Sequence, residues 1–148
     1  MDSLVGLGSV GYKLAKAFSK HPQYKIITID HEEGADIRVP KHEHPEEYEE
    51  NFPIIVDQFR DIAGEILFVI SGASIISGAA LRVLEQIHNK GPVSILYIHP
   101  DVDTLSQTRR LQTNVVFGVL QQYARSGVFK QFYVIDNQQI DKILGGAP

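Results

Sequence analysis

Three glycines near the start of the chain have the spacing of a phosphate-binding turn. Gly6, Gly8 and Gly11 form the pattern GxGxxG within GLGSVG, between an expected strand and an expected helix. Glycines at this spacing permit a tight turn and let backbone N–H groups at a helix N-terminus approach phosphate oxygens. The pattern predicts a nucleotide-binding turn that also includes Ser9. The alternative is that the glycines serve only the packing of strand against helix.

An acidic residue at the expected end of the second strand favours a dinucleotide. Asp30 follows Gly11 by 19 residues, close to the separation at which dinucleotide-binding folds place an acid that hydrogen-bonds a ribose hydroxyl. Asp30 therefore indicates NAD(P) as the cofactor, with the capping of a loop as its alternative role.

A second turn of small residues follows the third expected strand, over residues 71–80. Small residues between a strand and a helix again present N–H groups to an anion, so two such turns could hold one polyphosphate from two sides. This turn is not a Walker loop, because GK[ST] does not occur. Its alternative is a flexible turn without a ligand, since Ile75 and Ile76 are bulky for a phosphate cradle. The candidate phosphate-binding residues are Gly72, Ala73, Ser74, Ser77 and Gly78.

Other polar groups give weaker indications. His42 and His44 lie two residues apart in an acidic stretch, a spacing that fixes no metal geometry, so we predict a solvated loop and no metal site. Asp101 and Asp103 follow the fourth expected strand and could face a ribose or Mg²⁺ through water, although loop capping is the favoured role. No catalytic residue is identified, and GxSxG is lacking.

Apolar runs rich in β-branched and aromatic residues alternate with segments of helical length. This alternation predicts an α/β fold with a parallel, Rossmann-like sheet that is covered by helices on both faces. A long helix is expected over residues 104–123. The stretch from 31 to 53 is expected to be a long acidic surface loop, with a helix start at Pro45. The expected strands span residues 3–5, 24–30, 65–71, 93–99 and 131–136.

Length and composition indicate one nucleotide-binding domain over residues 1–148, which could be the N-terminal part of a longer chain. The net charge of -4 excludes a strongly basic nucleic-acid surface. The chain has no cysteine, which excludes disulfides, zinc–thiolate sites and thiol catalysis. It also has neither an apolar run long enough for a membrane span nor a signal peptide. We therefore expect a cytoplasmic protein that binds neither nucleic acid nor membranes.

The order of features from Gly72 onward resembles the nucleotide-binding domain of the tubulin and FtsZ superfamily. The segment Ser77-Gly78-Ala79-Ala80 is similar to the end of the GGGTGSG signature, and a further strand ends in Ile135-Asp136-Asn137. The resemblance implies that GTP or GDP is the cofactor, with Mg²⁺ as a possible companion, and that Asn137 reads the guanine base. It also implies that Arg110 contacts the nucleotide. The alternatives are a helix N-cap at Asn137 and a solvated basic pair at Arg109 and Arg110.

The resemblance is strongest to the short, divergent tubulin-like proteins of bacteriophages, which would place the protein in a host cytoplasm. It implies self-association into protofilaments and a GTPase that is active only when intact and polymerised. Two departures from the family pattern are evident: Ile75 replaces a threonine, and the chain ends at Pro148, before the acidic loop that would support hydrolysis.

Three functions thus stay open. The first is a GTP-binding domain of a filament-forming protein, and the second is a Rossmann domain that binds NAD(P) as a regulatory ligand. The third is a tubulin-like scaffold that has lost nucleotide binding.

Overall fold

A computed structural model describes residues 2–21, 23–72 and 74–136 of the chain. Their strands form one six-stranded sheet in the order β3-β2-β1-β4-β5-β6, and every neighbouring pair is parallel. This confirms the expected α/β, Rossmann-like fold. The strands are β1 (Ser3–Leu7), β2 (Lys25–Asp30), β3 (Ile37–Arg38), β4 (Ile66–Ser71), β5 (Val93–His99) and β6 (Phe132–Asp136).

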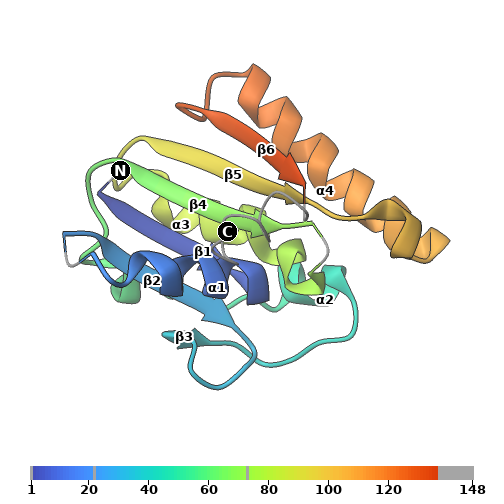
Figure 1. Cartoon of the computed structure of the whole chain (residues 1–148), viewed down its shortest axis with the longest axis horizontal. Helices are drawn as coiled ribbons and strands as arrows, with labels where there is room; N and C mark the ends of the chain where they lie inside the picture. The colour runs from blue at the N-terminus through green and yellow to red at the C-terminus, as the bar shows by residue number, and fades with distance from the viewer. Residues whose placement is uncertain (1, 22, 73, 137–148) are drawn as a thin grey trace, which may run out of the picture.

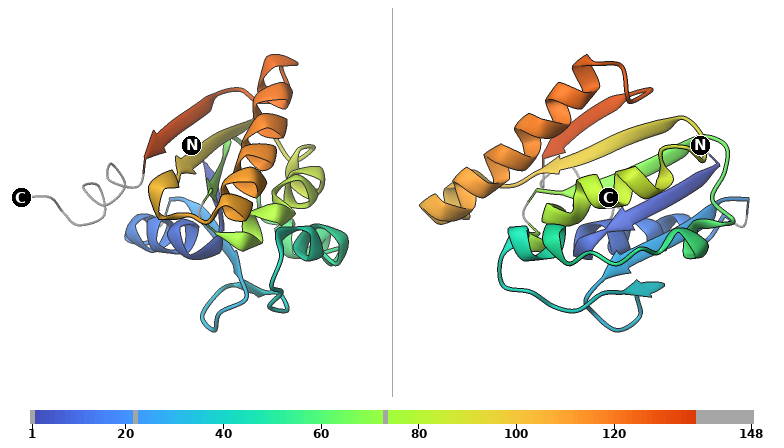
Figure 2. Two further views of the ribbon diagram at one scale, coloured as in Figure 1. Left: turned by 90° about the vertical axis from the view of Figure 1, so that its right-hand side faces the viewer. Right: turned by 180° about the vertical axis from the view of Figure 1, so that it is seen from behind.

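The helices lie on both faces of the sheet (Figure 1). Helix α1 lies on one face, and α2, α3 and α4 lie on the other, as the view onto the carboxyl ends of the strands makes clear (Figure 2, left). The helices are α1 (Gly8–Phe18), α2 (Pro45–Glu50), α3 (Ala80–Ile87) and α4 (Gln107–Arg125), with three short 3₁₀ turns, η1 (Val56–Phe59), η2 (Ile75–Ala79) and η3 (Val102–Thr104).

Side chains alternate between two apolar cores, one on each face of the sheet. Because successive residues of a strand point to opposite faces, Phe68 of β4 joins the core beneath α3 and α4, whereas Val69 joins the core beneath α1. Residues on both faces must therefore be apolar, which explains the near-continuous apolar runs that identified these strands.

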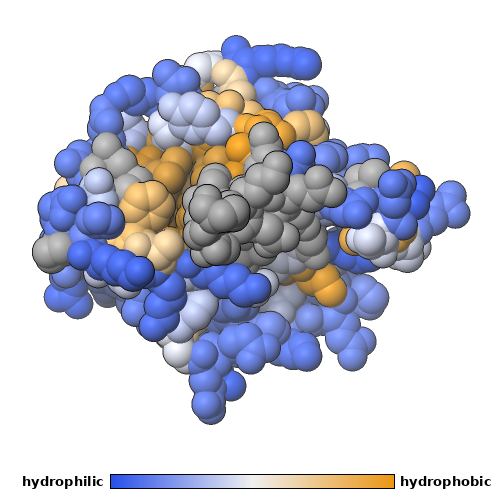
Figure 3. Space-filling view, viewed as in Figure 1, coloured by the Kyte–Doolittle hydropathy of each residue, from blue (hydrophilic) through white to orange (hydrophobic). Residues whose placement is uncertain are grey.

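The face that carries α1 is only partly covered by the described residues. Apolar side chains are visible over the sheet beside α1 (Figure 3). Leu67, Leu96 and Ile135 are only partly buried there. Among the residues that the structure describes, no helix is both long and apolar enough to cross a membrane.

Several boundaries differ from those expected. Strand β1 continues to Leu7, so α1 begins directly at Gly8 without an intervening loop. The acidic stretch contains β3, which pairs with the end of β2, besides the expected α2. The long helix begins at Gln107 because Ser106 caps it: the Ser106 Oγ accepts a hydrogen bond of 3.1 Å from the Arg109 N–H.

The strand order reverses at β1. The chain runs from β1 outward to β2 and β3, and then returns to place β4 on the other side of β1. In open α/β sheets, ligands bind at such a switch point, outside the carboxyl ends of the strands. The fold therefore directs attention to the residues that follow β1, β2 and β4.

Candidate nucleotide-binding site

The first glycine turn brings β1 and α1 into direct backbone contact. A Cβ on Gly6 would lie 2.6 Å from the Gly11 carbonyl oxygen, and a Cβ on Gly11 would lie 2.9 Å from the Gly6 carbonyl carbon. Real Cβ atoms do not come so close to backbone, so both positions require glycine. Gly8 has a φ of +85°, in the left-handed region that glycine adopts without strain. The local backbone geometry thus explains glycine at all three positions without a ligand.

The second turn packs directly on the first. A Cβ on Gly8 would lie 2.9 Å from the Ser74 Oγ and 3.1 Å from the Ile76 Cγ2. The structure therefore brings Gly8 and Ser74 together, as the two-turn hypothesis requires. The side chain of Ile76 is 3% exposed and occupies space beside Gly8, so the two turns touch each other. Phosphate binding between them stays a prediction.

The rest of the second turn has packing roles. The Ser77 hydroxyl donates a hydrogen bond to the Ser71 carbonyl oxygen. A Cβ on Gly78 would overlap the backbone of Pro45 in α2, and one on Gly72 would overlap the Tyr97 hydroxyl. These contacts explain the small residues without a ligand. Two other predicted site residues, Ala73 and Asn137, lie outside the described part of the chain.

Asp30 is a buried acid at the carboxyl end of β2. Its side chain is 7% exposed, and its Oδ1 accepts a 2.8 Å hydrogen bond from the His31 backbone N–H. The same oxygen lies 3.2 Å from the His31 Nδ1. A buried carboxylate is costly unless it is hydrogen-bonded, and these contacts involve Oδ1 alone.

Asp30 borders two clefts. The first, which we call the helix-side cleft, has a volume of about 250 Å³ and lies against α1. The second, the loop-side cleft, has a volume of about 150 Å³ and lies between the segments that follow β2 and β4. The helix-side cleft is lined by Ser9, Tyr12, Lys13, Asp30, Glu32, Glu33 and Ala35, and the loop-side cleft by Asp30, His31, Lys41, His42, Tyr48, Ser74, Ile75 and Ile76.

The walls of the loop-side cleft are positioned by α2. Tyr48 of this helix is buried, and its hydroxyl oxygen accepts a 3.0 Å hydrogen bond from the His42 N–H. The two rings also meet edge to face, with centroids 4.9 Å apart. Ile75 and Ile76 form an apolar wall of the same cleft. Flat aromatic and apolar surfaces of this kind can hold a planar ring.

The remaining polar candidates lie apart from Asp30. Arg110 belongs to the first turns of α4, is exposed, and lines neither cleft. Asp101 caps its own loop, because its Oδ1 accepts a 3.1 Å hydrogen bond from the Asp103 N–H. Within the described ranges, no group of three or more His, Cys, Asp or Glu side chains is arranged to hold a metal ion.

Three buried polar atoms near the carboxyl edge were not predicted from the sequence. The Ser71 Oγ, the Tyr97 hydroxyl and the His99 Nδ1 have no hydrogen-bond partner among the described residues. Burial raises the pKa of Tyr97 to about 12, although the nearby Arg109 charge acts in the opposite direction. The only signal in the sequence was the polar character of Tyr97 and His99, in a strand that also contains Ser94.

The fold is similar to that of a solved short chain dehydrogenase family protein from Francisella tularensis subsp. tularensis SCHU S4. The TM-score is 0.51 and the sequence identity is 12%. The match covers 85% of this chain but 62% of the dehydrogenase chain, so this chain spans less than two thirds of that protein. At this identity the similarity shows the fold alone. No protein-family model matches the sequence, and a search of curated proteins gives no match.

The resemblance to the tubulin and FtsZ superfamily, including its bacteriophage members, is therefore wrong. The structural match is to a Rossmann-fold dehydrogenase family protein, and nothing in it supports GTP as the cofactor or a cytoskeletal function. A small-residue turn followed by helix, strand, loop and long helix occurs in parallel α/β domains generally, so this order of features could not distinguish the families. The prediction of self-association is untested by these findings.

Proposed function

We propose that this chain is a Rossmann domain that binds NAD. The observation that carries the proposal is the position of Asp30, a buried carboxylate at the carboxyl end of β2, beside the glycine turn and between two clefts. In dinucleotide-binding folds an acid in this position accepts hydrogen bonds from the hydroxyls of the adenosine ribose. The dehydrogenase fold of the structural neighbour supports the same class of ligand.

The start of α1 suits the pyrophosphate. This helix has no acidic residue in its first turn, and no side chain caps its N-terminus. Its first N–H groups and the positive end of its dipole thus favour an anion. Because Ser74 and Ile76 contact Gly8, we infer that the segment 74–76 shifts away from Gly8 when a phosphate group contacts it.

The loop-side cleft suits the adenine ring. It adjoins Asp30 on the side of the switch point, and its walls include Ile75, Ile76 and His42. Apolar and aromatic walls bury a flat base without requiring a fixed pattern of hydrogen bonds. The bulk of the two isoleucines, which argued against a phosphate cradle, is then useful as a surface for the base.

The charges around Asp30 favour NAD over NADP. Glu32 and Glu33 line the helix-side cleft together with Asp30. These three acids outnumber Lys13, the cationic residue in the same lining, so the charge close to the ribose would repel the 2′-phosphate of NADP. We also place the protein in the cytoplasm, with NAD as a regulatory ligand.

Thermal-shift titration of the purified chain with NAD, NADP, ADP and GDP tests the proposal. We expect NAD to stabilise the chain most, by about 2.7 kcal/mol at one hundred times its Kd, with a weaker effect of NADP and none of GDP. A chain that responds to none of the four ligands, or that responds to GDP as strongly as to NAD, contradicts the proposal.

Asp30→Asn is expected to weaken NAD binding about tenfold, which corresponds to ~1.4 kcal/mol, because the ribose loses a charged acceptor. The affinity for NADP should fall less or should rise, since the variant repels the 2′-phosphate less. Isothermal titration calorimetry with both ligands measures the two changes. Asp61→Asn is the matched control: Asp61 is exposed and precedes β4, at the opposite edge of the sheet, and should leave both affinities unchanged.

A further inference from the structure

Helix α4 is only weakly buried by the rest of the chain. It has 19 residues, of which only Thr113 and Leu120 are buried. Leu111 is 62% exposed and Val115 is 66% exposed. The N-terminal end of the helix projects past the carboxyl edge of the sheet (Figures 1 and 2). A large part of its apolar surface thus lacks a partner among the described residues.

The two most exposed apolar residues of α4 lie on one stripe of the helix, and the less exposed Tyr123 lies outside it. Leu111, Val115, Gly118 and Gln122 are separated by four, three and four residues, the spacing of a seam between two packed helices. Glycine weakens the interior of a helix, and a Cβ on Gly118 would have no neighbour within 4 Å. Packing within the described residues therefore does not require this glycine, whereas the close approach of a second helix does.

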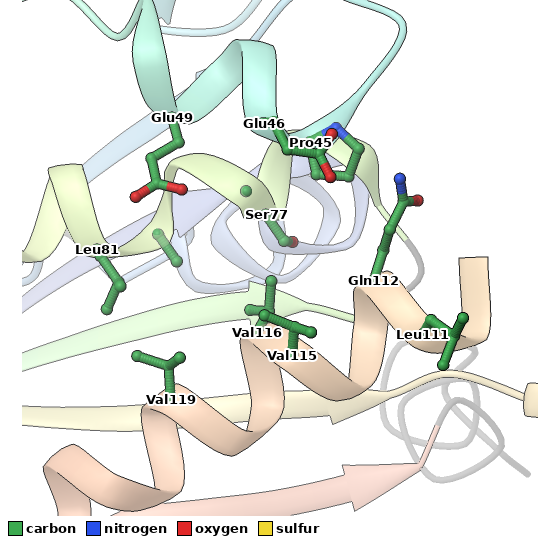
Figure 4. Close-up of a pocket in the computed structure, with 12 residues that line it drawn as sticks. Pro45, Glu46, Glu49, Ser77, Leu81, Leu111, Gln112, Val115, Val116 and Val119 are labelled. Atoms are coloured by element: carbon green, nitrogen blue, oxygen red, sulfur yellow. The ribbon is translucent and has the colours of Figure 1, made fainter. Parts of the chain in front are cut away.

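A groove runs along this stripe, and Leu111 and Val115 of the stripe also line it. It has a volume of about 300 Å³ and lies between α4 on one side and α2, η2 and α3 on the other. Val116 and Val119 point across it toward Ser77 and Leu81, and Glu46 and Glu49 stand at the far side (Figure 4). The floor of the groove is thus mainly apolar, and its far rim is acidic.

The acidic rim of the groove and the basic residues of α4 are complementary in charge. The α2 rim contributes Glu46 and Glu49, of which Glu49 also lies 3.9 Å from Arg82 of α3, whereas α4 carries arginines and no acidic residue between Gln107 and Arg125. One chain therefore presents both an apolar ridge with basic charges and an apolar groove with an acidic rim, side by side. In a two-fold symmetric dimer both copies use the same surface patch, so this patch must be complementary to itself.

We infer that the groove binds α4 of a second copy of this chain in a two-fold symmetric dimer. The two α4 helices lie antiparallel, with the Val115 side chains close to the axis and the Gly118 positions allowing close approach. Leu111 of each copy enters the groove of the other, and the arginines of each α4 face the α2 rim of the other. The groove and the loop-side cleft share no lining residue, but α2 and η2 border both, so the dimer is measured on the chain without added nucleotide.

Sedimentation velocity on the full chain, from about 1 to about 100 µM, tests the dimer. We expect a concentration-dependent shift from monomer to dimer. Val115→Glu should raise the dimer dissociation constant at least about tenfold, because it places two like charges beside the axis and near the acidic rim. Gly118→Leu should have an effect of similar size, because the added side chain separates the two helices.

Val128→Glu is the matched control. Val128 is 50% exposed, lies in the turn after α4, and undergoes the same chemical change away from the stripe, so it should leave the dissociation constant unchanged. Circular dichroism establishes that each variant is folded. A chain that stays monomeric at the highest concentration overturns the inference and leaves the groove to a different protein. A dimer that Val115→Glu and Gly118→Leu do not weaken overturns it too, because such a dimer uses another face.

Discussion

Replacing Gly6 by alanine is expected to lower the free energy of unfolding by about 3 kcal/mol. The new Cβ would lie 2.6 Å from the Gly11 carbonyl oxygen, and the neighbouring group is backbone at the first turn of α1, which cannot rotate away. Helix and strand must therefore separate, which disturbs the apolar core beneath α1. Urea unfolding followed by circular dichroism measures the change. Gly11→Ala should act similarly, because its Cβ meets the backbone of Gly6.

Gly118→Ala is the control for the loss of a glycine as such. A Cβ there has no neighbour within 4 Å, and alanine is the better residue in a helix interior, so stability should rise by about 0.5–1 kcal/mol. Measured at a concentration where the chain is monomeric, the two substitutions should have opposite signs. If Gly6→Ala were neutral, the close contact between β1 and α1 in the structure would be incorrect.

Gly6→Ala also distinguishes two interpretations of the glycine pattern. If Gly6, Gly8 and Gly11 serve packing alone, Gly6→Ala lowers the stability, and neither the unsubstituted chain nor the variant responds to NAD. If the turn also binds pyrophosphate, the folded fraction of the variant should lose NAD affinity beyond what its lower stability explains, because the N–H groups at the start of α1 move. Calorimetric titration well below the melting temperature of the variant distinguishes the two.

The sheet could be predicted from the sequence because most of its strands are buried on both faces. Runs such as 66–71 and 93–99 are rich in apolar residues, and the structure gives them as β4 and β5. Strand β3 was missed because it has only two residues, Ile37 and Arg38, within an acidic stretch. Its existence depends on pairing with the end of β2, a tertiary contact that leaves no periodic signal in so short a segment.

The candidate site was predictable only where it depends on local spacing. The glycine turn and Asp30 follow from positions along the chain, and the structure places both at the switch point. The loop-side cleft was not predictable, because its walls come from separate segments: His42 and Tyr48 near α2, and Ile75 and Ile76 after β4. What brings these segments together is the fold of the stretch 31–53 around Tyr48, whose hydroxyl is hydrogen-bonded to His42.

The second turn shows why a motif alone does not establish a binding role. Ser77 and Gly78 matched the end of a phosphate-binding signature, yet their contacts are with Ser71 and Pro45. Small residues are required both where a backbone approaches a ligand and where it approaches another backbone. Only the three-dimensional neighbours of a residue can distinguish these cases.

The buried hydroxyl of Tyr97 should make stability fall steeply at high pH. Its pKa is about 12 in the folded chain, against about 10 for an unfolded tyrosine. Between these values the unfolded state has released the proton while the folded state still holds it, so the free energy of unfolding falls as pH rises. The resulting loss of stability is absent below the unfolded pKa, is about 1.4 kcal/mol near pH 11, and is about 2.3 kcal/mol near pH 12.

Tyr97→Phe isolates this effect from the titration of every other group. Because the Tyr97 hydroxyl has no partner among the described residues, its removal near pH 7 should be neutral or stabilising by up to about 1 kcal/mol. At pH 11 the free energy of unfolding of the variant should exceed that of the unsubstituted chain by a further ~1.4 kcal/mol. Urea unfolding at a series of pH values measures this difference. Tyr133→Phe is the control in the neighbouring strand, since Tyr133 is 48% exposed, and its pH profile should parallel that of the unsubstituted chain. If the Tyr97→Phe profile runs parallel as well, the hydroxyl titrates in the folded chain as it does in water, and a polar partner or solvent must reach it between β5 and α4.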